Sequence, residues 1–215
     1  MNRTTRTELT VLGLIFLVSS RLISQTTDDI QLLAPAFENN ATLMQALQNR
    51  KSERSFSEKD LSLQQLSDLL WAANGVNRKA SGKRTVPTAR DKREIDVYVA
   101  MAKGLYLYDA DNHLLTLVLK EDIRALTGKQ EFVKKAAVNL VFVADYDKMS
   151  GNRESNDFYS ATDTGFISQN VYLYCAAEGL ATVVRGMVDR EPLAEKMGLR
   201  KGQNIVLAQT VGYPK

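Results

Sequence analysis

Residues that carry much of enzyme chemistry are scarce in this sequence. The 215 residues include one cysteine, Cys175, and one histidine, His113. A zinc site or a cysteine–histidine catalytic pair needs several such side chains in one place, so neither is expected. A single cysteine also excludes an intramolecular disulfide, and Cys175 lies in an apolar helical pattern typical of a core residue. Any enzymatic chemistry is therefore expected to depend on a bound organic cofactor, without a metal.

Positive charge is concentrated in one part of the chain. The net charge is only +3, but residues 49–93 contain eleven lysines and arginines against five acidic residues. Such a cluster suits a small anionic ligand. It would also attract nucleic acid, but only Phe56 and Trp71 supply aromatic rings for base stacking in this stretch. We therefore expect no nucleic-acid partner.

The amino terminus has the pattern of a secretory signal peptide. Arginines precede an apolar run at residues 9–18, which is short for a membrane span, and small residues follow it. We expect residues 1–24 to be cleaved and the protein to be exported, to the periplasm or beyond. An uncleaved membrane anchor and a buried terminal helix are the alternatives. Residues 25–39 then form a lead-in segment, and residues 40–215 form one domain.

Apolar periodicity predicts an α+β domain in which helices flank a mostly antiparallel sheet. Ser62 is expected to cap a helix, and Gly75 to end it in the left-handed conformation. Residues 76–93 lack periodicity and are expected to form a loop. The other predicted helices are residues 41–50, 121–127, 131–135 and 160–178, and the predicted strands are residues 94–101, 104–108, 114–119, 137–144, 181–188 and 205–211.

The segment Arg50-Lys51-Ser52-Glu53-Arg54 directly follows the first predicted helix. Arginine offers planar, permanently charged donors that fit phosphate oxygens, and Ser52 adds a hydroxyl donor. The segment is therefore a candidate phosphate site. The alternative is an exposed basic helix end, whose cations oppose the negative end of the helix dipole.

Five segments stand out along the chain, in the order Arg50–Arg54, Arg84–Arg90, Asp163–Leu173, Glu178–Gly186 and Val211–Pro214. In this order they resemble motifs of the FMN-dependent nitroreductase superfamily, and the resemblance runs from about residue 40 to the carboxyl terminus. Two further stretches, Leu70–Gly75 and Gly104–Asp109, are similar to the SagB-type dehydrogenase branch of that superfamily.

The resemblance implies a homodimer that binds FMN at the subunit interface. Arg50 and Ser52 would hold the phosphate, and Pro87, Thr88 and Ala89 would cover the flavin from the partner subunit. Gly165 weakens a helix unless it permits a close approach, which a contact between the two long helices would explain. The implied cofactor-binding residues are Arg50, Lys51, Ser52, Arg54, Pro87, Thr88, Ala89, Arg90, Gln169, Val184, Arg185, Gly186 and Lys215.

The implied activity is a two-electron oxidoreduction in a ping-pong cycle. A reduced nicotinamide, NAD(P)H, or another reductant would supply electrons through FMN to a nitroaromatic, quinone or related small acceptor. Tyr159 would face the substrate, or would simply be an exposed tyrosine. Arg185 stands where classical nitroreductases often carry Glu, a change expected to alter the polarity around the flavin ring. The alternatives are a flavin-binding or scaffold protein without turnover, a SagB-type dehydrogenase, and a phosphate-binding module without flavin.

Overall fold

The computed structural model describes residues 28–37 and 41–215, and the predicted signal peptide lies outside these residues. The described part consists of strands, α-helices and short 3-10 turns (η). In chain order these are β1 (Ile30–Gln31), α1 (Leu43–Asn49), α2 (Leu63–Asn74), β2 (Val76–Arg78), β3 (Lys83–Arg84), η1 (Ala89–Asp91), β4 (Ile95–Met101), β5 (Gly104–Asp109), β6 (Leu114–Leu119), η2 (Arg124–Thr127), η3 (Glu131–Lys134), β7 (Val138–Asp145), η4 (Tyr146–Lys148), α3 (Arg153–Ala177), β8 (Ala181–Arg185), α4 (Arg190–Met197) and β9 (Gln203–Gly212).

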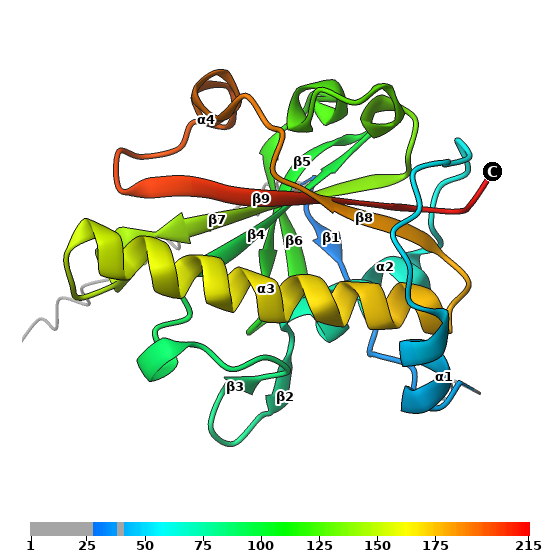
Figure 1. Cartoon of the computed structure of the whole chain (residues 1–215), viewed down its shortest axis with the longest axis horizontal. Helices are drawn as coiled ribbons and strands as arrows, with labels where there is room; N and C mark the ends of the chain where they lie inside the picture. The colour runs from blue at the N-terminus through cyan, green and yellow to red at the C-terminus, as the bar shows by residue number, and fades with distance from the viewer. Residues whose placement is uncertain (1–27, 38–40) are drawn as a thin grey trace, which may run out of the picture.

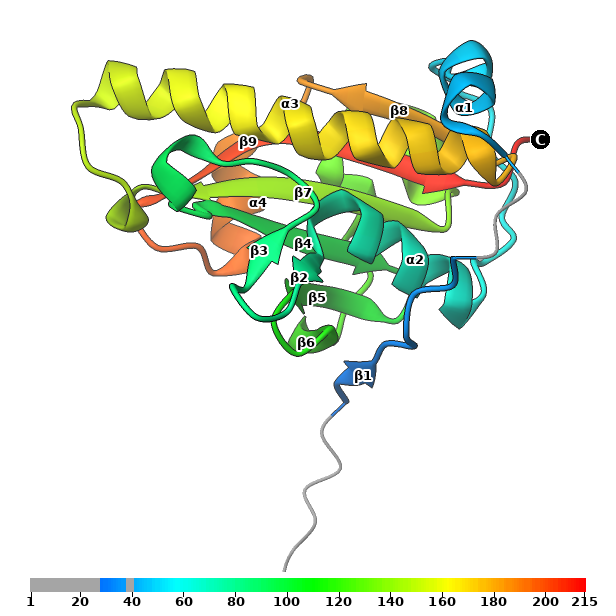
Figure 2. The ribbon, with the colours of Figure 1, turned by 90° about the horizontal axis from the view of Figure 1, so that it is seen from below.

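A seven-stranded sheet organises the chain, in the order β1-β6-β5-β4-β7-β9-β8, and every neighbouring pair is antiparallel. Helices α1, α2 and α3 lie on one side of this sheet, and α4 lies on the other (Figures 1 and 2). The small β2–β3 hairpin stands outside the main sheet (Figure 1). The predicted α+β class, with helices flanking an antiparallel sheet, is confirmed.

Strand β7 forms the centre of the core. All eight of its residues are buried, and their side chains alternate between the two faces of the sheet. Leu140 and Phe142 belong to the cluster that α2 and α3 cover, whereas Val141 and Val143 belong to the cluster that includes Leu193 of α4. The strand predicted at residues 137–144 is confirmed, and it is buried on both faces.

Helix α3 begins at Arg153, well before the predicted start at residue 160. The side chain of Asn152 caps it by accepting a hydrogen bond from the Ser155 amide at 2.9 Å. The early turns lack an apolar stripe because their buried positions are polar, as at Asn156 and Ser160. Periodicity therefore could not place the true start of this helix.

The prediction for α2 is correct at its start and wrong about its end. Ser62 caps the helix and accepts a hydrogen bond from the Gln65 amide at 3.1 Å. Gly75, however, has φ −77° and ψ 162°, which is extended and not left-handed. A Cβ added at Gly75 would lie 2.6 Å from Trp71 Cδ1 and 2.7 Å from Trp71 Cα. Glycine is needed here for close packing, not for a special backbone conformation.

The region 76–93 is also more ordered than the predicted loop. It contains the β2–β3 hairpin and the turn η1. Arg90, Asp91 and Arg93 have φ angles of 55°, 55° and 51°, in the left-handed region that residues with side chains rarely adopt. This concentration of unfavourable backbone geometry directly precedes β4.

Helix α1 forms as predicted, but its apolar residues remain uncovered. Leu43, Met44 and Leu47 are 65%, 72% and 45% exposed. Soluble monomers seldom leave such large side chains together at the surface. Within residues 28–37 and 41–215, no helix has the length and apolar character needed to cross a membrane.

Candidate functional site

Backbone hydrogen bonds hold the segment that follows α1 between β8 and the carboxyl terminus. The Glu53 amide donates to the Thr182 carbonyl at 2.9 Å, and the Lys215 amide donates to the Ser55 carbonyl at 3.2 Å. Phe56 forms a bridge with Pro214. These backbone contacts bring the predicted cofactor residues of the segment, and Lys215, to the same end of the sheet.

Tyr172 of α3 links three of the predicted site elements. Its hydroxyl lies 2.8 Å from Ser52 Oγ and accepts a hydrogen bond from the Val184 amide at 3.0 Å. The Arg50 guanidinium carbon lies 5.4 Å from the centre of the Tyr172 ring, within the range of a cation–π contact. Tyr172 is not among the predicted site residues, because a tyrosine on the buried side of a helix also fits an ordinary core position.

Replacing Tyr172 with phenylalanine is expected to lower the free energy of unfolding by about 1–3 kcal/mol. The substitution removes the one acceptor that the described residues offer the Val184 amide, and leaving a part-buried donor without a partner has a cost of this order. Urea denaturation would measure the change, with Tyr159→Phe on the exposed side of α3 as the control. Equal effects of the two substitutions would contradict a special role for Tyr172.

A cavity of about 460 Å³ opens beside this linkage, and its lining includes Lys51, Glu53, Tyr172, Thr182 and Pro214. Lys51 forms an ion pair with Glu53 at 3.3 Å, and this contact, together with backbone donors, lowers the pKa of the Glu53 carboxyl. The exposed Arg54 and half-buried Arg50 form no ion pair among the described residues. A set of cations and hydroxyls of this kind fits a phosphate group without a metal.

The predicted flavin-covering segment lies elsewhere on α3. The Ala89 amide donates to Oδ2 of Asp163 at 2.8 Å, and Thr88 Oγ1 accepts from the Arg93 amide at 3.1 Å. Pro87 and Arg90 are exposed. This segment is therefore anchored to the middle of α3, whereas Arg50 and Ser52 are anchored nearer its end.

Within one chain, the two groups of predicted site residues do not meet. Asp163 and Tyr172 are nine positions apart, which corresponds to about 13 Å along an α-helix. Gln169 lies between them on the exposed side of α3, and Tyr159 is 42% exposed, with its ring 5.3 Å from that of Phe158. A single chain therefore presents two partial sites along one helix.

The side chain of Arg185 does not face the α3 side of β8, contrary to the expectation that it would alter the polarity around a flavin there. It is buried on the opposite face, where it donates to the Thr127 carbonyl at 2.7 Å, to Thr210 Oγ1 at 3.0 Å and to Asn139 Oδ1 at 3.1 Å. Burial lowers the pKa of the guanidinium to about 10, so the group stays charged near pH 7. Only the backbone of Arg185 can contribute to a site on the α3 side.

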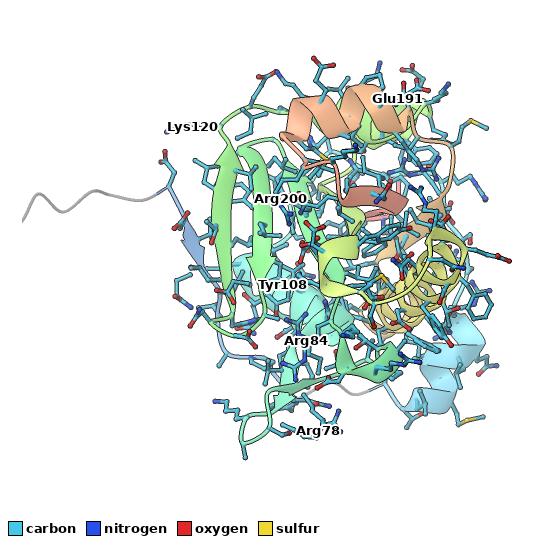
Figure 3. All side chains as sticks on the ribbon, turned by 90° about the vertical axis from the view of Figure 1, so that its left-hand side faces the viewer. Arg78, Arg84, Tyr108, Lys120, Glu191 and Arg200 are labelled. Atoms are coloured by element: carbon cyan, nitrogen blue, oxygen red, sulfur yellow. The ribbon has the colours of Figure 1, made fainter. Side chains whose placement is uncertain are left out.

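The basic region of residues 49–93 is divided by the fold. One part is the segment after α1, and the other is the β2–β3 hairpin, whose Arg78 and Arg84 lie in the lower part of Figure 3. Burial lowers the pKa of Arg84. The structure therefore does not bring the predicted cluster together as one anionic-ligand surface.

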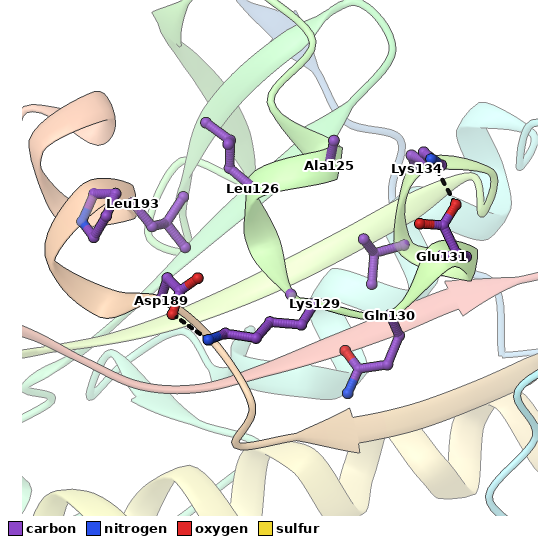
Figure 4. A pocket seen from close by; sticks show the side chains of 11 residues that line it. Ala125, Leu126, Lys129, Gln130, Glu131, Lys134, Asp189 and Leu193 are labelled. Atoms are coloured by element: carbon purple, nitrogen blue, oxygen red, sulfur yellow. Dashed lines mark ion pairs between the residues drawn. The ribbon is translucent and has the colours of Figure 1, made fainter.

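A second cavity, of about 320 Å³, lies on the α4 side of the sheet (Figure 4). Its lysines are already paired, with Lys129 on Asp189 at 2.7 Å and Lys134 on Glu131 at 2.6 Å. This pairing makes the cavity a weaker anion site than the segment after α1. In the part of the chain that the structure describes, no three His, Cys, Asp or Glu side chains gather in a way that could hold a metal ion.

The chain is similar to known proteins of one family. The model of the Nitroreductase family matches residues 47–213. The chain is 31% identical over 170 residues to the Methanocaldococcus jannaschii protein named "Putative nitroreductase MJ1384", covering 74% of this chain and 85% of that one. A crystal structure of a "putative nitroreductase" from Ralstonia eutropha JMP134 has 44% identity and a TM-score of 0.83, covering 87% of this chain and 90% of the other.

A more distant structure shares the fold. The NADPH:FMN oxidoreductase from Vibrio harveyi, complexed with NAD⁺, has 18% identity and a TM-score of 0.61, covering 80% of this chain and 69% of that one. The family match spans most of the chain, including the segment after α1, the core helix α3 and β8. The chain therefore belongs to the nitroreductase family of flavin-dependent oxidoreductases.

Proposed function

We propose that the chain binds FMN and transfers two electrons from a reduced nicotinamide to a nitroaromatic, quinone or related small acceptor. The observation that carries the proposal is the linkage of Arg50, Ser52 and Val184 through Tyr172. FMN supplies the hydride chemistry when it is bound. The name of the Vibrio harveyi relative, which includes both NADPH and FMN, supports this choice of cofactor and donor.

In this proposal the chain's own residues bind and orient the cofactor. Arg50, Ser52 and Lys215 hold the phosphate, since charged donors and a hydroxyl form strong hydrogen bonds to its oxygens. Lys51 adds charge nearby, and Arg54 faces the ribityl or pyrimidine side. The backbone of Val184–Gly186 lies along the ring edge. The Val184 amide already donates to Tyr172, which fixes the position of this stretch.

We also propose that a homodimer completes the site, with Pro87–Arg90 and Gln169 of one subunit covering the cofactor held by the other. Large apolar side chains stand uncovered on the two helices that lie together at this side of the molecule (Figure 2). On α3 these are Phe158, Tyr159 and Phe166, which are 66%, 42% and 42% exposed. The uncovered apolar face of α1 adds further surface that a second copy would bury.

The test of the proposed function is the visible spectrum of the purified protein after FMN is added, followed by anaerobic titration with NADH and NADPH. A bound flavin that bleaches supports the oxidoreductase. A bound flavin that neither nicotinamide bleaches would overturn the proposed donor and favour a binding role or a different reductant. A colourless protein would overturn the assignment of FMN.

Replacing Arg50 with alanine is expected to weaken FMN binding by about 1.5–3 kcal/mol, roughly tenfold to more than a hundredfold in Kd. The substitution removes a charged donor to the phosphate and its contact with the Tyr172 ring. Fluorescence titration with FMN would measure the loss, with Lys103→Ala in the exposed β4–β5 turn as the control for lost charge. An unchanged Kd in the Arg50 variant would remove this residue from the site.

A further inference from the structure

Two acidic side chains are buried together where β4 begins against α3. Glu94 is 0% exposed and Asp163 is 2% exposed. Among the described residues, no other residue donates a hydrogen bond to the Glu94 carboxyl group, which approaches its own backbone amide and lies within hydrogen-bonding reach of the Asp163 carboxyl. A buried carboxylate so poorly supplied with donors is strongly unfavourable. A protonated carboxyl, in contrast, can donate a hydrogen bond to a neighbouring carboxylate.

Asp163 also holds the backbone of the segment that precedes Glu94. Its Oδ2 accepts the Ala89 amide at 2.8 Å. Directly after this contact, Arg90, Asp91 and Arg93 adopt φ angles of 55°, 55° and 51°. Such residues raise the energy of the folded chain and persist only where surrounding contacts hold them. The carboxyl pair is therefore connected to the most strained stretch of the described chain.

Other charged groups around Glu94 are already engaged. Lys148 of η4 is the cation whose charge reaches Glu94, and it pairs with Asp96 at 2.7 Å. Asp145, whose amide donates to the Glu94 carbonyl at 2.9 Å, pairs with Arg200 at 2.8 Å.

In the strained segment, the Arg93 guanidinium pairs with Asp91 at 2.9 Å. Arg90 is exposed, and Lys92 is half-buried. Neither of these two cations forms an ion pair with a carboxylate of the described residues. The buried neighbour of Glu94 is thus a second carboxyl group. Two adjacent buried carboxylates would repel each other, so a proton is expected between them.

We infer that Glu94 and Asp163 share one proton and that this pair is a positioning element that fixes the segment Thr88–Asp91. Protonated Glu94 donates to Asp163, and Asp163 accepts the Ala89 amide from the other side. Loss of the shared proton places two negative charges side by side in a buried site and weakens the anchor. The consequence for catalysis rests on the proposed function, which places this segment over the flavin of the partner subunit.

The direction of the pH effect follows from the environment of Glu94. Burial, reinforced by the adjacent Asp163, raises the pKa of Glu94 from its ordinary value of 4.5 to about 7. As pH rises above 4.5 the unfolded chain releases this proton while the folded chain retains it, so the unfolded state gains stability relative to the folded one. The contribution of the pair is therefore complete below pH 4.5 and is lost as pH rises through about 7.

The first experiment compares the wild-type protein with Glu94→Gln, which keeps a donor toward Asp163 without needing a proton. Between pH 5 and 8, the folding equilibrium constant of the wild type is expected to fall roughly 10- to 100-fold more than that of Glu94→Gln. The surface variant Glu131→Gln serves as the control and is expected to follow the wild type. Parallel pH profiles for the wild type and Glu94→Gln would overturn the shared proton.

The second experiment measures hydrogen exchange at the Ala89 amide in protein free of flavin, with rates corrected for intrinsic exchange. Protection in the wild type is expected to fall at least tenfold between pH 5.5 and 8.5, while Glu94→Gln keeps its protection. Protection that is independent of pH in the wild type would overturn the role of the pair in positioning this segment. Because neither measurement needs FMN, failure of the proposed cofactor would leave both results interpretable.

Discussion

Replacement of Asn139 by leucine is expected to lower the free energy of unfolding by about 3–5 kcal/mol, the range found when a buried charge loses its partner. Arg185 is a buried cation, and neutral acceptors hold it in place of a carboxylate. Asn139 Oδ1 accepts from the Arg185 guanidinium at 3.1 Å and from Thr210 Oγ1 at 2.6 Å. The same side chain donates to the Val133 carbonyl at 2.6 Å. Leucine has the same branching and the same number of side-chain heavy atoms as asparagine, although its methyl groups make it larger, and it makes none of these bonds.

Urea denaturation at pH 7 in the absence of flavin would measure this loss. Asn77→Leu in the exposed strand β2 is the matched control and is expected to change stability by less than about 0.5 kcal/mol. Because Arg185 adjoins Val184 on β8, the Asn139 variant is also expected to bind FMN more weakly. A loss below about 1 kcal/mol would mean that the guanidinium finds another acceptor or water, and would contradict this account of the core.

The fold was largely predictable where apolar residues follow the period of a helix or a strand. Strand β7 was predicted because six of its eight residues are apolar. The start of α3 was not predicted, because Asn156, Ser160 and Asp163 occupy its buried face in place of apolar residues. Gly75 was assigned the wrong conformation, since sequence alone does not show that the Trp71 backbone occupies the space of a Cβ.

The candidate site was predictable only in part, because some of its residues are far apart in the sequence and resemble core residues. Arg50 and Ser52 carry a recognisable donor chemistry and stand together in the sequence. Tyr172, which links them to β8, lies far along the chain and resembles a core residue. The Glu94–Asp163 pair is also invisible in sequence, because only the packing of β4 against α3 reveals that both acids are buried. Contacts between residues that are far apart in the sequence could therefore be identified only from the structure.

Replacement of Gly165 by leucine is expected to dissociate the proposed dimer and, with it, to remove bound FMN. A Cβ at Gly165 has no heavy atom within 4 Å in its own chain, apart from its helix backbone and sequence neighbours. Leucine also favours helix over glycine by up to about 1 kcal/mol, so the isolated subunit should fold at least as well as the wild type. Any unfavourable effect of the side chain must then come from a second subunit packed against α3.

Overpacking of a close contact costs about 1–3 kcal/mol, and a two-fold axis introduces two such side chains. The dimer dissociation constant is therefore expected to rise roughly 30-fold to 25,000-fold, with a matching loss of flavin absorbance at low protein concentration. Analytical ultracentrifugation would measure the mass, and Glu195→Leu on the exposed side of α4 would control for an added apolar side chain. A Gly165→Leu protein that stays dimeric would place the interface elsewhere. A monomeric protein that still holds FMN tightly would show that one chain supplies the whole cofactor site.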